Sequence, residues 1–140
     1  MVGKVITTSL RDVKYVRADE YWLITRGGKD ILGLSRHIGL SPSPELFSRY
    51  CYKWRGQDPA TWWPTYKSVF ERELQTEGKL AELRAIYRLV QAGKTVALVC
   101  YCSDAEHCHR LLVGEFLAQH GIAVSEVEPP PKPVQLALSL

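Results

Sequence analysis

The sequence predicts an α/β fold of three layers, with helices packed on the faces of a small, mostly parallel central sheet. Short β-branched or apolar segments alternate along it with longer segments whose apolar residues recur at helical spacing. The 140 residues are 46% hydrophobic and 24% charged, which suits one domain with a sizeable core. We expect this domain to span residues 1–128, followed by a proline-rich linker and an apolar tail over residues 129–140.

The first part of the chain predicts two strands, a loop and a helix. Lys4–Ser9 is rich in β-branched residues, and Tyr21–Thr25 is a second apolar run that ends at a glycine turn. Ile31–Leu40 is interrupted by glycines and is expected to be a loop. Ser43 then provides an N-cap for a helix over residues 44–53, with proline at its first position.

Two helices are predicted in the middle of the chain. The first starts at Thr61–Pro64, which places Pro64 in the first turn, where a missing N–H is harmless. Trp62 is the tryptophan expected to be exposed. The second helix ends at Gly93. The residues expected to face the core are Trp63, Tyr66, Phe70 and Leu74 in the first helix and Leu80, Leu83, Ile86, Tyr87 and Val90 in the second.

The last part of the domain predicts a strand, a helix and a final short strand over Thr95–Tyr101, Leu111–His120 and Ile122–Val127. Val99–Arg110 overlaps the first junction and holds three of the four cysteines and two of the four histidines. A turn from a strand into a helix is where α/β proteins bind anions and place nucleophiles.

One interpretation of this junction is an anion site. Arg110, helped by His109, would hold a phosphate, sulfate or carboxylate at the start of the helix. Arg26 also follows a predicted strand, and ligands bind at the carboxyl ends of strands in open α/β sheets. We therefore expect Arg26 to lie in the same pocket.

Two other interpretations depend on the cysteines. Cys102 or Cys108 could be an activated thiolate, with His107 or His109 as the neighbouring base. The spacing to Arg110 is not that of a phosphatase loop, and Cys100 is most simply a small buried apolar residue. The weakest interpretation is a zinc or iron site, whose ligands would be Cys100, Cys102, Cys108 and His109.

Several of these segments also occur together in one known family. They are the strand ending in Ile24–Gly28, the segment Leu40–Leu46, the helix bearing Tyr66, Phe70, Glu73 and Leu74, and the strand leading to Cys100 and then to Cys108-His109-Arg110. In these segments the chain resembles the domain-of-unknown-function 488 family. The resemblance implies an α/β fold and matches Arg26, Cys108, His109 and Arg110 to the family's motif positions.

Beyond the prolines, leucines alternate with small residues, which is the period of an extended strand. This tail resembles the bacterial sliding-clamp-binding peptide, in which a glutamine and spaced leucines dock into an apolar pocket. Packing on the domain, or exchange between two copies in a homodimer, are the alternatives. The residues that would carry the contact are Gln135, Leu136, Leu138 and Leu140.

The net charge of +3 is mildly basic and permits binding to nucleic acid without requiring it. Aromatic and basic residues alternate over residues 49–67, a pattern found both in cores and on surfaces that bind single strands. No apolar run approaches the roughly 20 residues of a membrane span, and the first residues lack the apolar core of a signal peptide. We therefore expect no membrane partner and a cytoplasmic location, with the cysteines reduced.

Two hypotheses of different classes follow. In the first, the domain is an enzyme or binding protein for an anionic small molecule or nucleic acid. Arg26 and Arg110 would then bind the substrate, and Cys102, Cys108 and His109 would provide the chemistry. In the second, it is a non-catalytic dimeric or adaptor module, in which the cysteines are structural and the tail makes the contact.

Overall fold

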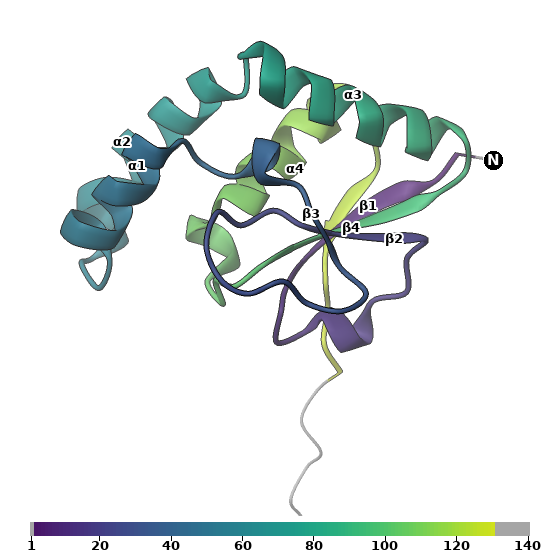
Figure 1. Cartoon of the computed structure of the whole chain (residues 1–140), viewed down its shortest axis with the longest axis horizontal. Coiled ribbons are helices and arrows are strands. Elements are labelled where there is room, and N and C mark those ends of the chain that lie inside the picture. The colour runs from purple at the N-terminus through teal and green to yellow at the C-terminus, as the bar shows by residue number, and fades with distance from the viewer. Residues whose placement is uncertain (1, 131–140) are drawn as a thin grey trace, which may run out of the picture.

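The computed structural model describes residues 2–130 and has a central sheet of parallel strands (Figure 1). The strands lie in the order β3-β2-β4-β1-β5, and each pairs in parallel with its neighbours. β4 is therefore the central strand, between β1 and β2. The strand bounds are Lys4–Ser9 for β1, Glu20–Leu23 for β2, Ser35–Arg36 for β3, Thr95–Cys100 for β4 and Val124–Glu126 for β5.

The α-helices share one core with the sheet. They are α1 (Pro44–Arg49), α2 (Pro59–Glu73), α3 (Glu77–Gln91) and α4 (His109–Gln119), and a π-helix over Tyr50–Trp54 follows α1 directly. Alternate residues of β4 face this core, because successive side chains of a strand point to opposite faces. The core includes Leu46 of α1, Phe70 of α2, Ile86 of α3, Leu112 of α4, and Val96, Leu98 and Cys100 of β4.

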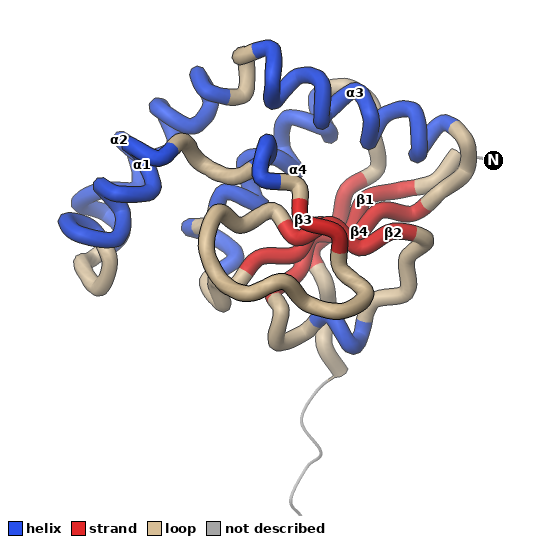
Figure 2. The backbone as a smooth tube through the Cα atoms, in the orientation of Figure 1, coloured by secondary structure: helices blue, strands red, loops and turns tan. Residues whose placement is uncertain are grey.

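The other face of the sheet is covered by connections. The segment between β1 and β2, with a short 3₁₀-helix at Val13–Tyr15, and the loop before β3 pack there against Ala97 and Val99. Figure 2 shows this arrangement, with the helices above the strands and the connections below them. The predicted three-layer α/β fold with a parallel sheet is therefore confirmed.

Most of the predicted elements are present, with one strand missed. Ile31–Leu40 was expected to be a loop, but it contains the two-residue β3 and a 3₁₀-helix at Ile38–Leu40. β3 is too short to show a period-2 pattern. Ser43 caps α1 as predicted, because its Oγ accepts the Leu46 N–H at 3.2 Å.

The start of α2 was predicted wrongly. α2 begins at Pro59, capped by Asp58, so Pro64 lies inside the helix rather than in its first turn. An aspartate followed by proline is a strong helix start that the prediction overlooked. The expected exposure of Trp62 was also wrong: Trp62 is buried and Trp63 is half-buried. Trp62 packs between the π-helix residues Tyr50 and Trp54, which sequence periodicity within α2 alone does not reveal.

None of the helices in residues 2–130 combines the length and the apolar character needed to cross a membrane. The predicted tail contacts at Gln135, Leu136, Leu138 and Leu140 lie outside the described residues.

Candidate functional site

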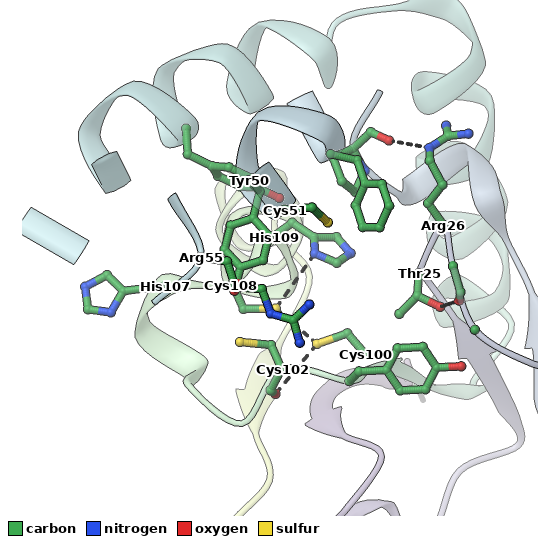
Figure 3. Close-up of a pocket in the computed structure, with 16 residues that line it drawn as sticks. Thr25, Arg26, Tyr50, Cys51, Arg55, Cys100, Cys102, His107, Cys108 and His109 are labelled. Carbon is green, nitrogen blue, oxygen red and sulfur yellow. Dashed lines mark hydrogen bonds between the residues drawn. The ribbon is translucent and has the colours of Figure 1, made fainter. Parts of the chain in front are cut away.

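A pocket of about 390 Å³ opens at the carboxyl ends of β2 and β4 (Figure 3). The chain after β2 contributes Thr25–Gly28, and the end of β4 with the two residues after it contributes Cys100–Cys102. Cys108 and His109 at the start of α4 form the base, and the π-helix and the residue after it add Tyr50, Cys51 and Arg55. All four cysteines of the chain line this pocket. It lies where open α/β sheets bind ligands.

The loop that carries Arg26 is held in place by a second arginine. Arg36 donates to the carbonyl oxygens of Thr25 and Gly27, both at 3.0 Å, and also to those of Gly28 and Lys29. Gly28 has φ +88°, and a side chain there would collide with the Tyr101 ring, so only glycine fits the turn. The loop is thus held in position by an arginine that does not itself line the pocket.

Arg26 lines the pocket, as predicted, together with His109. Its Nε donates to the carbonyl oxygen of Pro42 at 2.8 Å, which ties the side chain to the segment before α1. The guanidinium is half-buried. Arg26 and the start of α4 therefore share one concave site, although about 80 residues separate them in the sequence.

Arg110 does not line the pocket, which corrects its predicted contact with an external anion. Its side chain is 1% exposed, and its Nε and Nη2 donate to the two carboxylate oxygens of Glu126 at 3.0 and 2.9 Å. Its Nη1 donates to the Cys102 carbonyl oxygen and to the Cys100 sulfur at 2.9 Å. The guanidinium is thus occupied by internal acceptors and braces the cysteine loop from behind.

Cys100, Cys102 and Cys108 all lie close to the Arg110 guanidinium. The Cys100 and Cys108 sulfurs are 3.0 Å apart, and the Cys102 thiol donates to the Asp104 carbonyl oxygen at 3.5 Å. The neighbouring Cys108 side chain, the backbone at Asp104 and the charge of Arg110 together lower the pKa of Cys102 to about 6, against the opposing effect of burial. Cys102 is half-buried and reaches the pocket, whereas Cys100 is buried, as predicted.

Cys108 has the opposite character. The neighbouring Cys100 and Cys102 side chains, together with burial, raise its pKa well above the usual value of a thiol. A thiol that donates to a neighbouring thiolate stays protonated itself. Of the two cysteines predicted as nucleophiles, the environment therefore favours Cys102.

His109 is held in one tautomer. Its Nε2 lies 2.6 Å from the carbonyl oxygen of Ile24, which can only accept, so Nε2 carries the hydrogen. Burial lowers the pKa of His109 to about 4, so the ring is neutral at pH 7. Its Nδ1 is then an unprotonated acceptor, 3.8 Å from the Cys108 sulfur. At neutral pH, Nδ1 of His109 can therefore accept a proton but has none to donate.

His107 is placed differently from His109. Its Nδ1 lies 2.8 Å from a carboxylate oxygen of Asp104, and its ring meets the edge of Trp63. It lines the pocket, but in Figure 3 it lies away from the cysteines. His107 is therefore a residue of the pocket wall rather than the partner of a thiol.

Sequence reasoning missed the contribution of the π-helix. Arg55 and Tyr50 belong to the alternating aromatic and basic segment, and that pattern was the one signal that singled them out. Arg55 is exposed and lines the pocket (Figure 3). π-Helical turns are rare and are frequent at functional sites. Glu126 was also missed, since nothing in its local sequence marks it as the partner of Arg110.

The pocket wall carries arginines but no carboxylates among its described residues. Among the described residues that line it are two arginines and two histidines, and none of them is Asp or Glu. Within residues 2–130, no three His, Cys, Asp or Glu side chains are arranged so that they could hold a metal ion. The arrangement gives no support to the zinc or iron alternative, and it suits a negatively charged ligand beside a thiolate.

A family model described as the active DUF488-N3 subclade matches residues 34–121, which is more than half of the chain. The matched range contains Arg55 and the whole segment from Cys100 to Arg110, whereas Arg26 and Glu126 lie outside it. No curated protein and no solved structure matches the chain.

Proposed function

The chain belongs to the DUF488 family, and on that premise we propose that it is an enzyme that binds an anionic substrate in this pocket and attacks it with the Cys102 thiolate. The observation that carries the proposal is the composition of the pocket wall. Arg26 and Arg55 line it with Cys102, and no described lining residue is a carboxylate. The matched model is described as active, which agrees with catalysis.

The arginines would bind the substrate. Arg26 comes from the chain after β2 and Arg55 from the residue after the π-helix, so they reach the pocket from separate elements. Arginine is the residue best suited to phosphate and carboxylate, because its planar group presents several N–H donors together. A phosphate-bearing small molecule, or a phosphate of nucleic acid, fits this role.

Cys102 would be the nucleophile. With a pKa of about 6, most of its thiol is ionised at pH 7 without any proton transfer to a base. The thiolate would form a bond to an electrophilic atom of the substrate, and the leaving group would depart with its bonding electron pair. The start of α4 adds a positive dipole end on the same side of the pocket.

His109 and Arg110 would act by positioning. Arg110 fixes the Cys102 carbonyl oxygen, and the unprotonated Nδ1 of His109 lies 3.8 Å from the Cys108 sulfur. Neither side chain needs to touch the substrate for the thiolate to be held in place. The motif of Cys108, His109 and Arg110 would then support the reacting group rather than form it.

We also propose, from the sequence alone, that residues 135–140 dock on a bacterial sliding clamp. DNA would then be the source of the phosphate groups, and the protein would work in the cytoplasm. These proposals are independent of the pocket chemistry.

Two small electrophiles test the main proposal. Iodoacetate and iodoacetamide both alkylate thiolates with loss of iodide, but only iodoacetate is an anion. For each protein, the rate at which iodoacetate modifies Cys102 is divided by the rate for iodoacetamide. We expect this ratio to be higher in the wild type than in the R26Q/R55Q double variant. Arg88→Gln, an exposed arginine on α3, is the matched control. An equal preference in all three proteins would contradict the proposal.

A further inference from the structure

We propose that Ser35, His37 and Glu82 form a second catalytic site, in which Ser35 is the nucleophile for hydrolysis of carboxylic esters. The three side chains are joined by hydrogen bonds. The Ser35 Oγ lies 3.1 Å from His37 Nε2, and His37 Nδ1 lies 2.9 Å from a carboxylate oxygen of Glu82. A hydroxyl, an imidazole and a carboxylate in this order are the components of a serine hydrolase triad. None of the three lines the pocket that holds the cysteines, so this site is separate from the activity proposed above.

The His37 ring is held by side chains from two other elements. Its face stacks on the Trp22 ring in β2, with the ring centroids 3.5 Å apart and the planes 7° from parallel. Its Nδ1 meets Glu82 of α3, the helix that lies above the strands in Figure 1. Gly39 leaves room for Glu82, because a Cβ at position 39 would come within 2.9 Å of the Glu82 Cγ. These contacts direct Nε2 toward Ser35.

The carboxylate sets the tautomer that a general base needs. A carboxylate oxygen only accepts hydrogen bonds, so the hydrogen of a neutral His37 ring lies on Nδ1, and Nε2 is left as an acceptor. The Ser35 hydroxyl can then donate to Nε2 at 3.1 Å, whereas the Tyr21 carbonyl oxygen is farther away at 3.4 Å. The nearer of these two acceptors is thus the nitrogen that would remove the hydroxyl proton.

Ser35 is accessible to a substrate. It is exposed on β3, the edge strand of the sheet, and it lines an open depression with Asp19, Glu20 and Tyr21 beside the start of β2. The described residues that line this depression include two carboxylates and no arginine, lysine or histidine. Because these charges repel an anion, the depression favours neutral or cationic esters over anionic ones.

Hydrolysis would proceed through an acyl-serine. The Ser35 oxygen bonds to the carbonyl carbon of the ester while its proton passes to His37 Nε2. The bond from that carbon to the alcohol oxygen then breaks, and His37 returns the proton to the departing oxygen. Water attacks the acyl-serine in the same way: it gives a proton to His37, which passes it to the Ser35 oxygen as the carboxylic acid is released. Glu82 stabilises the positive charge that His37 carries between these transfers.

A fluorophosphonate probe tests the nucleophile without requiring turnover. It phosphonylates an activated serine with loss of fluoride, and trypsin then releases residues 30–36, which contain Ser35 and no other serine. We expect the label on this peptide in the wild type and none on it in Ser35→Ala. His37→Gln should slow labelling by at least about 100-fold, and Glu82→Gln by at least about tenfold. The matched controls, which replace exposed residues and should label at the wild-type rate, are Ser48→Ala, His120→Gln and Glu71→Gln.

Hydrolysis of p-nitrophenyl esters measures turnover and the preference for charge. The assay uses the Cys102→Ser background, so that the thiolate proposed above does not attack the ester. Hydrolysis should be lost when Ser35→Ala is added. The neutral butyrate ester should react at least about tenfold faster than the monoester of glutaric acid, whose acyl group carries a carboxylate. Equal rates for these two esters would contradict the proposed substrate class.

Two labelling results would overturn the site itself. One is the absence of label from residues 30–36 in the wild type, and the other is an equal labelling rate in the wild type and a folded His37→Gln. Circular dichroism and the urea midpoint show whether each variant is folded. If His37→Gln does not fold, Glu82→Gln decides in its place, because it keeps the size of the side chain and changes only the group that meets Nδ1.

Discussion

Arg110 and Glu126 are joined by two parallel hydrogen bonds, from Nε to Oε1 at 3.0 Å and from Nη2 to Oε2 at 2.9 Å. Arg110 lies in the first turn of α4 and Glu126 ends β5, so the pair links the α-helix and the strand that follow β4. The remaining guanidinium nitrogen, Nη1, bonds the Cys100 sulfur and the Cys102 carbonyl oxygen. A carboxylate outside the pocket wall thereby sets the direction of the arginine that braces the cysteines.

Glu126→Ala should destabilise the fold, because it leaves two buried donors of Arg110 without their acceptors. An unsatisfied buried polar group costs about 1–3 kcal/mol, and the loss should be visible as a lower urea midpoint with an unchanged slope. Glu128→Ala, an exposed glutamate two residues later, is the control and should stay within about 0.5 kcal/mol of wild type. Equal midpoints for the two variants would show that the pair contributes nothing.

The alkylation rate of Cys102 should follow its own ionisation. The pKa of Cys102 is lowered to about 6, so its reactive thiolate is present above pH 6 and is lost as the pH falls through that value. The rate with iodoacetamide should therefore reach half of its plateau near pH 6. Mass spectrometry at each pH identifies the modified residue. The phase should persist in Cys51→Ser and vanish in Cys102→Ser; a midpoint near pH 9 would disprove the assignment.

The stability of the protein should depend on pH through His109. Its folded pKa of about 4 lies below the unfolded value of 6.5, so the unfolded chain binds more protons between these values. Stability is complete above pH 6.5 and declines as the pH falls to 4, by an upper limit of about 3 kcal/mol. Urea unfolding from pH 4 to 7 should show this slope. His109→Gln should flatten it, whereas His120→Gln, which replaces an exposed histidine, should not.

Arg55→Gln should weaken binding of inorganic phosphate, because it removes a charged donor from the pocket wall. A hydrogen bond to a charged group contributes about 1.5–3 kcal/mol, which corresponds to at least a tenfold loss of affinity. Titration followed by NMR shifts of the pocket residues measures it. Wild-type affinity should also fall with added salt. Unchanged affinity in Arg55→Gln, with Arg88→Gln as control, would remove Arg55 from the site.

The tail can be tested apart from the domain. Replacement of Gln135 and Leu138 with alanine should abolish capture by a purified bacterial sliding clamp, because these residues would supply the hydrogen bonds and the apolar contact. Val134→Ala is the neighbouring control. Capture that survives the double replacement, or no capture by the wild-type chain, would end the clamp proposal.

The fold could be predicted because its signals are local. The β-branched run of β1, the N-cap at Ser43 and the apolar run of β4 each specify their element within a few residues. β3 was not predicted, because a strand of two residues is too short to show an alternating pattern. Its role depends on Arg36, which donates to the loop after β2. The start of α2 was predicted wrongly because the apolar helical pattern begins at the tryptophans, after the Asp58 cap.

The candidate site could be predicted in part. A strand that ends in cysteines and a helix that starts with His109 placed it correctly, and Arg26 was expected there from strand topology alone. The internal hydrogen bonds of Arg110 could not be predicted, because the carboxylate that accepts them, Glu126, comes from β5. The addition of Arg55 depends on the π-helix, and a helix of that kind leaves no pattern of its own in the sequence.

The strand order determines when, during synthesis, the contacts around Cys102 can form. β1 pairs with β4 and β5, so the strand that is synthesised first can pair only after the last two have been made. The hydrogen bonds between Arg110 and Glu126 form only when residue 126 has left the ribosome. A nascent or prematurely terminated chain has its cysteines but not the brace that arranges them. The arrangement of Arg110 around the Cys102 carbonyl oxygen is therefore complete only in a chain that extends through Glu126.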